Sequence, residues 1–189
     1  MYYNLLIDWD DQTAESGIVE PVTVAEVKNY LRLEGFIDDT DSLSTDFDDD
    51  NTLIAELITS ARLRLEEYTG LSFIPKTWEI EFTNQAGNFE IPFGPVISIN
   101  SLEDSSGDPV AASDYKLSNG KRVLKTPTWE EMVMNYEAGY INLPATLKDA
   151  MMKEIAYRYI NRGDVNVDGI SREAQMLAST YKQSFTWLG

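Results

Sequence analysis

The hydrophobic periodicity of the sequence changes twice along the chain, and this limits the folds that the chain can adopt. Apolar residues recur at steps of three and four in the second quarter of the sequence, which predicts an amphipathic helix over 50–69. The step then becomes two, because Trp78, Ile80 and Phe82 alternate with glutamates, as is typical of a half-buried strand. Helical spacing returns near residue 144. A chain that passes from helix to strands and back to helix predicts an α+β fold.

The order of these elements predicts how the chain is organised. Thr23 and Glu26 have the spacing of a capping box and mark the start of a first helix. We expect helices at both ends of the chain, packed as a small bundle around an inserted small antiparallel β unit. The expected parts are an acidic N-terminal arm at 1–20, a central domain at 21–163 (helices 23–33, 50–69 and 144–161, β insertion 77–137), and a C-terminal helix with an apolar tail at 164–189.

Composition excludes several classes of function. The 189 residues include no cysteine and no histidine, which removes disulfides, Cys or Cys/His zinc sites, thiol nucleophiles and imidazole bases. A net charge of -17 repels phosphate, so sequence-specific nucleic-acid binding and anionic membranes are poor matches. We find no apolar run near the roughly 20 residues that span a bilayer and no signal peptide, so we expect an intracellular product.

The acidic residues are concentrated in one loop. Seven of the thirteen residues from Asp38 to Asp50 are acidic, and no Lys or Arg lies between Arg32 and Arg62. Such a segment is typical of a solvated loop, and its last aspartates favour the positive end of the next helix. The acidic residues of this loop that precede Asp50 are Asp38, Asp39, Asp41, Asp46, Asp48 and Asp49.

One short pattern indicates a calcium ligand set. Asp164, Asn166 and Asp168 are followed by Gly169, as in the first half of an EF-hand loop, where alternate oxygens converge on a hard cation. The twelfth position is Gln175, where that loop requires a bidentate glutamate. An Asx-rich turn between two helices explains the same residues, so calcium is the weaker interpretation.

Large apolar residues lie at both chain ends, where core residues are uncommon. The interface candidates are Tyr2, Tyr3, Trp9, Phe185, Trp187 and Leu188. The alternative is that both ends fold back over the domain.

No catalytic constellation stands out. The sequence has no G-x-G-x-x-G and no Walker pattern, and no carboxylate pair is distinguished among 32 acidic residues. We therefore predict no enzyme activity and no cofactor. A calcium-dependent binding module or a carboxylate-based hydrolase is the alternative.

Several short segments follow one another in a fixed order. They are residues 20–33, residues 49–62, Leu65-Glu-Glu-Tyr-Thr-Gly70, the stretch 91–107 with Pro95-Val96 and Gly107, Asp114-Tyr115, Tyr136-Glu-Ala-Gly-Tyr140, and 144–162. In this order they resemble the head–tail connector proteins of tailed bacteriophages, with 20–33 similar to the family's opening helix and 49–62 to its second helix. The chain departs from the family in its longer acidic loop and in residues 164–189.

The resemblance implies a structural role in the virion. Members form a ring, usually of twelve copies, below the portal protein at the capsid vertex and above a tail component or second adaptor. DNA passes through the ring during packaging and ejection. The resemblance also implies synthesis in the host bacterial cytoplasm. The net charge is compatible with this role, because an anionic channel lets DNA slide without binding phosphate, and an anionic surface is not expected to bind a membrane. We expect the acidic loop that contains Asp38, Asp39, Asp41, Asp46, Asp48 and Asp49 to face the channel or the rim of the ring.

Overall fold

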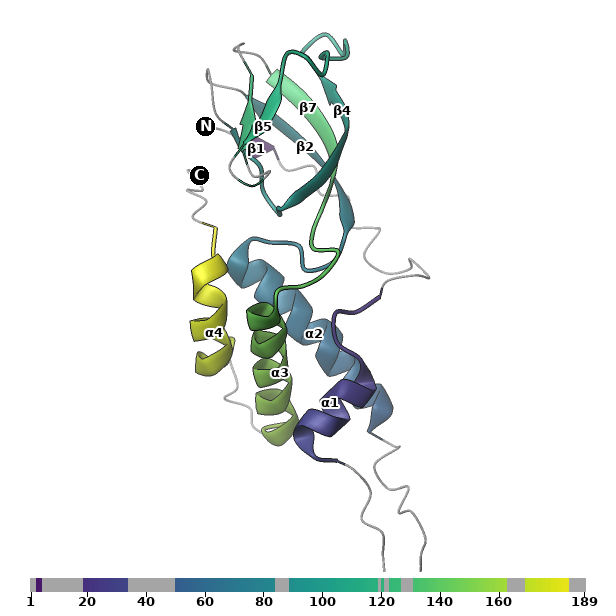
Figure 1. Ribbon diagram of the computed structural model, residues 1–189, viewed down its shortest axis with the longest axis vertical. Coiled ribbons are helices and arrows are strands. Elements are labelled where there is room, and N and C mark those ends of the chain that lie inside the picture. The colour runs from purple at the N-terminus through teal and green to yellow at the C-terminus, as the bar shows by residue number, and fades with distance from the viewer. Residues whose placement is uncertain are drawn as a thin grey trace, which may run out of the picture. The chain divides into compact units, whose positions relative to one another are not determined.

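The chain divides into a helical unit and a β unit (Figure 1). The computed structural model describes residues 3–4, 19–33, 50–83, 89–118, 120, 123–126, 131–162 and 169–183. The helical unit comprises 20–69 and 142–182, and the β unit comprises 1–19, 70–141 and 183–189. The prediction of an α+β fold with helices at both ends and an inserted antiparallel β unit is confirmed.

Within the described ranges, four helices form the helical unit. They are α1 (Val24–Leu31), α2 (Asn51–Thr69), α3 (Ala145–Ile160) and α4 (Arg172–Ala178), and a 3-10 turn at Ser179–Tyr181 follows α4. α3 contacts the other three helices, and α2 contacts α1, α3 and α4. The expected helices at 23–33, 50–69 and 144–161 correspond to α1, α2 and α3. The C-terminal helix expected within 164–189 corresponds to α4, which the 3-10 turn follows.

The ends of two helices follow from local sequence. The capping box predicted at the start of α1 is present: Glu26 N donates to Thr23 Oγ1 at 3.2 Å, and Thr23 N donates to Glu26 Oε2 at 2.8 Å. α2 ends at Thr69, and Gly70 follows with φ of 70°, the left-handed conformation that glycine adopts without a steric penalty. The hydrophobic pattern therefore sets the buried face of α2, and Gly70 sets its length.

Apolar side chains from all four helices form the helical core. The expected inward face of α2 contributes Ile54, Ile58, Ala61 and Leu65, all essentially inaccessible to solvent. The other helices contribute Val27, Leu147, Ala150, Met151, Ile155, Ala174 and Ala178.

The described residues of the β unit form two antiparallel sheets. β2 (Lys76–Thr83), β7 (Glu131–Ala138) and β4 (Val96–Glu103) lie in the first sheet with β7 central, and β1 (Tyr3–Asn4) pairs with the outer edge of β2. β3 (Phe89–Glu90), β6 (Val123–Lys125) and β5 (Lys116–Ser118) form the second sheet in that order.

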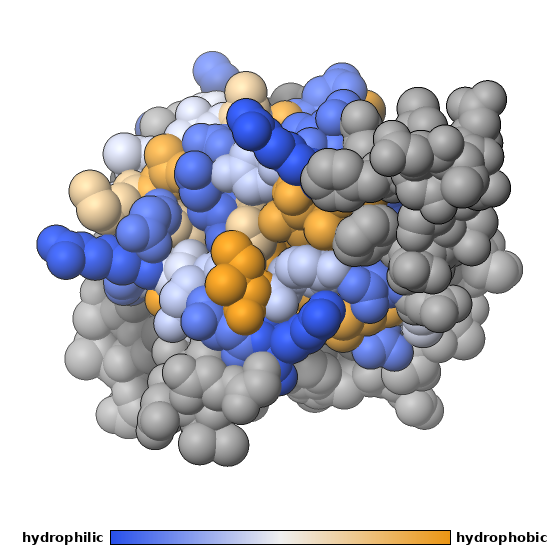
Figure 2. All heavy atoms as spheres, turned by 90° about the horizontal axis from the view of Figure 1, so that it is seen from below, coloured by the Kyte–Doolittle hydropathy of each residue, from blue (hydrophilic) through white to orange (hydrophobic). Residues whose placement is uncertain are grey.

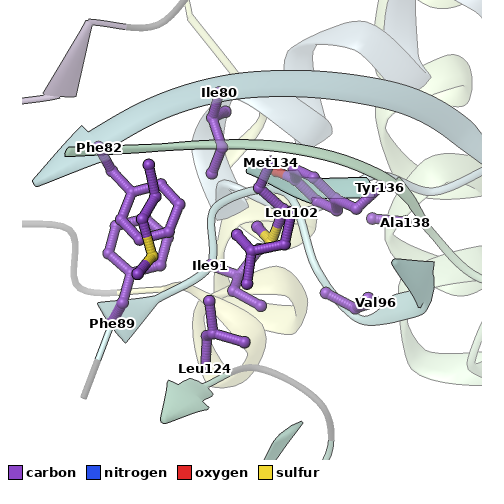
Figure 3. Packing of buried hydrophobic residues seen from close by; sticks show 11 residues of the cluster. Ile80, Phe82, Phe89, Ile91, Val96, Leu102, Leu124, Met134, Tyr136 and Ala138 are labelled. Atoms are coloured by element: carbon purple, nitrogen blue, oxygen red, sulfur yellow. The ribbon is translucent and has the colours of Figure 1, made fainter. Parts of the chain in front are cut away.

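Side chains from both sheets form the β core (Figure 3). Phe82 of β2 stacks on Phe89 of β3 with ring centroids 3.9 Å apart, and Leu124 of β6 lies in the same cluster. Tyr136 is fully buried, and its hydroxyl donates to the Pro92 carbonyl oxygen at 2.9 Å. Burial raises the pKa of Tyr136 well above its usual value, so this phenol stays neutral and acts as a structural donor.

Candidate assembly surface

Most of the site residues predicted from the sequence lie outside the described part of the chain. The exception is Tyr3, whose backbone belongs to β1 and pairs with Phe82 of β2. The predicted site residues outside the described ranges are the interface candidates Tyr2, Trp9, Phe185, Trp187 and Leu188, the acidic loop residues Asp38, Asp39, Asp41, Asp46, Asp48 and Asp49, and the calcium candidates Asp164, Asn166 and Asp168.

The described residues show two negative findings. In the described ranges, no group of three or more acidic side chains is placed to hold a metal ion. Within the same ranges, no helix combines the length and the apolar character needed to cross a membrane.

An ionic cluster fastens the start of the helical unit to α2. Arg62 is 3% exposed, and its Nε donates to Glu20 Oε2 at 2.8 Å while its Nη1 donates to Glu66 Oε2 at 3.0 Å. Nη2 of Arg62 and the Thr59 hydroxyl both donate to Glu20 Oε1. Burial opposes the charge on the guanidinium, but the two carboxylates outweigh it and raise the pKa of Arg62. The forked guanidinium thus holds two carboxylates from distant parts of the sequence.

Replacing Arg62 with lysine should weaken the helical unit by about 1–3 kcal/mol, since one ammonium cannot reproduce the three directed hydrogen bonds. Urea unfolding followed by helical circular dichroism measures the change. Arg64→Lys is the matched control, because Arg64 lies on the same helix and, among the described residues, makes a single hydrogen bond, from Nη1 to the Gly169 carbonyl oxygen at 3.3 Å. Equal unfolding midpoints for the two variants would contradict this assignment to Arg62.

A second cluster attaches α4 to α3. Glu154 is fully buried, and its Oε1 accepts from Arg158 Nε at 2.6 Å. Its Oε2 accepts from the backbone N–H of Ser171 at 2.7 Å, and Ser171 is the residue that caps α4. Arg158 Nη2 also donates to the Gly169 carbonyl at 2.5 Å. One buried carboxylate and its arginine therefore fix the chain where it enters α4.

Two further contacts join the helices at their ends. Asp50, directly before α2, accepts a short hydrogen bond from the Tyr159 hydroxyl and lies 3.4 Å from Arg162 Nη1. That hydrogen bond raises the pKa of Tyr159. Lys148 Nζ lies 2.6 Å from Glu26 Oε1, and this contact lowers the pKa of the Glu26 carboxyl.

These contacts account for most of the basic residues between 142 and 182. Lys148, Arg158 and Arg162 are engaged within the helical unit, and Lys182 lies 4.6 Å from the Tyr68 ring centroid. Sequence reasoning missed these pairings. The four-residue spacing of Glu154 and Arg158 signals an ion pair within one helix, but it does not reveal that the carboxylate is buried or that it binds Ser171.

Apolar side chains remain exposed on the helical unit. Figure 2 shows a face of the molecule on which hydrophobic side chains, in orange, lie exposed among hydrophilic ones, in blue. The exposed large hydrophobic residues of the described helices are Tyr30, Leu63, Tyr157, Ile160 and Met176. These side chains lie outside the buried core of the unit, so they are available for contacts with another molecule.

Solved chains from one kind of particle share this fold over the whole length. A chain from the neck of an empty GTA particle, computed with C6 symmetry, has a TM-score of 0.67 and 20% sequence identity, covering 100% of this chain and 99% of that one. A chain from the virion of a native gene transfer agent (GTA) particle has a TM-score of 0.61 and 20% identity, and one from the neck of a native particle, computed with C12 symmetry, has 0.63 and 18%, with the same coverage. No family model and no curated protein matches the sequence. At these identities the likeness establishes the fold.

Proposed function

We propose that this chain is a structural subunit of the neck, the head–tail junction, of a tailed phage or phage-like particle. The observation that carries the proposal is the fold shared over the full length of neck chains, 100% of this chain and 99% of that one. The segments between 20 and 162 support it independently, because they follow the same order along the chain as in head–tail connector proteins.

In this role the subunit forms a ring of about twelve copies between the portal protein and the next tail component or adaptor. The neck structures with C6 and C12 symmetry support a ring. The net charge of -17 suits a channel for DNA, because an anionic wall offers phosphate no counterion-releasing contacts. The ring catalyses nothing, is part of the virion, and is made in the host bacterial cytoplasm.

Segments that lie largely outside the described ranges have proposed roles in the same assembly. The acidic loop around Asp38–Asp49 faces the channel or the rim of the ring. The aromatic arm at 1–20 and the apolar residues Phe185, Trp187 and Leu188 contact neighbouring virion proteins, which suits large apolar side chains at chain ends.

Two measurements test the proposal. The first is electron-microscopic imaging of the particle that contains this chain, and the second is native mass spectrometry of the purified protein with and without its portal. We expect density for a ring at the head–tail junction, and a discrete complex whose mass is a whole-number multiple of the 21.4 kDa subunit. Absence of the chain from purified particles would overturn it. A monomer whose melting temperature rises strongly with calcium would favour the binding module instead.

A further inference from the structure

The helical unit exposes two different faces on opposite sides. α2 and α3 contact each other, and each directs its buried residues inward, among them Ile54, Ile58 and Leu65 from α2 and Met151 from α3. Residues half a turn away from these on each helix therefore point outward in opposite directions. The helical unit can therefore contact one neighbour through the outer face of α2 and another through the outer face of α3 at the same time.

The outer face of α2 is a shallow hollow. Small side chains line it, namely Ala55, Thr59 and Ser60, and acidic residues lie at both of its ends. The lining is completed by Glu56, Leu63, Arg64 and Glu67. Leu63 is 41% exposed, so the hollow contains apolar surface that no described part of the chain covers completely.

The outer face of α3 is a projection of large side chains. Ile160 is 75% exposed and Tyr157 is 37% exposed, and they lie three residues apart on the same side of the helix. Tyr30 of α1 extends this face, since Lys153 Nζ lies 5.7 Å from its ring centroid. Asp149 and Glu173 lie near Lys153, which is the cation of this face.

We propose that the outer face of α2 in one subunit receives the outer face of α3 and Tyr30 of the next copy of this chain, head to tail. The inference rests on the proposed ring and names the surfaces that form it. A contact between two different faces on opposite sides of one unit repeats from copy to copy and closes into a ring when the rotation fits. The small residues of α2 leave room for Tyr157 and Ile160.

Charge favours the same pairing. α2 carries three glutamates and two arginines, and α3 carries three basic and two acidic residues, so both contact elements are nearly neutral in a chain of net charge -17. Repulsion between copies is therefore smallest where these helices meet. Head-to-tail contact also brings Lys153 toward Glu56, whereas two α2 faces in contact would oppose the carboxylates of Glu56 and Glu67.

The absence of cysteine makes a direct test possible. Ser60→Cys places a thiol on the outer face of α2, and Ala156→Cys places one on the outer face of α3. The two single variants are treated with a bismaleimide with a spacer of roughly 10 Å, separately and mixed, and a chain carrying both substitutions is treated alone. We expect a cross-linked dimer only in the mixture and a ladder of multimers in the double variant. Ser60→Cys with Ser105→Cys is the matched control, because Ser105 is exposed in a turn of the β unit.

Each other outcome overturns the inference. Cross-linking of either single variant with itself would show a contact between identical faces. A ring mass for the wild-type protein without these cross-links would reject the surfaces while leaving the proposed neck function intact. A chain that stays at 21.4 kDa at high concentration without cross-links would contradict both the surfaces and the ring.

A charge reversal supplies a second measurement. Lys153→Glu should lower the cross-linking yield of the Ser60→Cys and Ala156→Cys pair roughly tenfold, because it opposes the carboxylates of α2. Glu56→Lys in the same chain should restore part of the yield. Unchanged yields in both variants would contradict the proposed contact between Lys153 of one copy and α2 of the next.

Discussion

Replacing Gly139 with alanine should unfold the β unit. Gly139 directly follows the central strand β7, and its N–H donates to the Pro95 carbonyl at 2.9 Å. A Cβ at this position would lie 2.1 Å from the Ile74 carbonyl oxygen and 2.9 Å from Pro75 N, which are backbone atoms and cannot rotate away. Its φ of 134° is also a conformation that residues with a side chain rarely adopt. We expect a loss of more than about 4 kcal/mol, a large part of the stability of an ordinary domain.

Near-ultraviolet circular dichroism during urea unfolding measures this loss, because the aromatic pairs Phe82–Phe89 and Trp78–Phe93 both lie in the β unit. Gly107→Ala is the matched control. Gly107 also has a positive φ, 80°, but no atom lies within 4 Å of its added Cβ, so only the backbone cost of about 1–2 kcal/mol remains. Similar midpoints for the two variants would show that the close approach to Ile74 is not what requires glycine.

Hydrophobic periodicity and the residues that cap helices predict much of the fold. The apolar residues of α2 mark its inward face, the capping box marks the start of α1, and alternation marks β2, because each signal depends on residues that are close together in the sequence. The pairing of β7 with both β2 and β4, and its central place in the sheet, depend on contacts across tens of residues that no local pattern specifies.

The candidate sites were predicted less completely, for a physical reason. Composition singles out segments of unusual charge or apolarity, and it therefore selects the acidic loop and the two chain ends. The ionic contacts that organise the helical unit use ordinary residues instead. Glu20 meets Arg62 and Asp50 meets Arg162, over separations of 42 and 112 residues, and only the folded chain brings these partners together.

Replacing Glu154 with alanine should detach α4 from α3. The carboxylate is fully buried and accepts from Arg158 Nε and from the Ser171 N–H, so its removal leaves a guanidinium that is 12% exposed and a buried backbone donor without this partner. Removing one member of a buried ion pair costs about 3–5 kcal/mol, because the remaining charge is no longer compensated. We expect a loss of this size in urea unfolding, together with faster hydrogen exchange across 169–178.

Two controls separate the buried ion pair from a general effect of losing a glutamate. Glu67→Ala removes an exposed carboxylate of α2 and should change stability by less than about 0.5 kcal/mol. Glu154→Gln keeps an acceptor for Ser171 but loses the charge opposite Arg158, so its loss should lie between those of the two alanine variants. Faster exchange confined to α4 in the Glu154→Ala variant would mean that this carboxylate positions the C-terminal helix. Exchange that rises equally in all four helices would instead assign Glu154 to the core as a whole, and α4 would then depend mainly on the packing of Ala174 and Ala178.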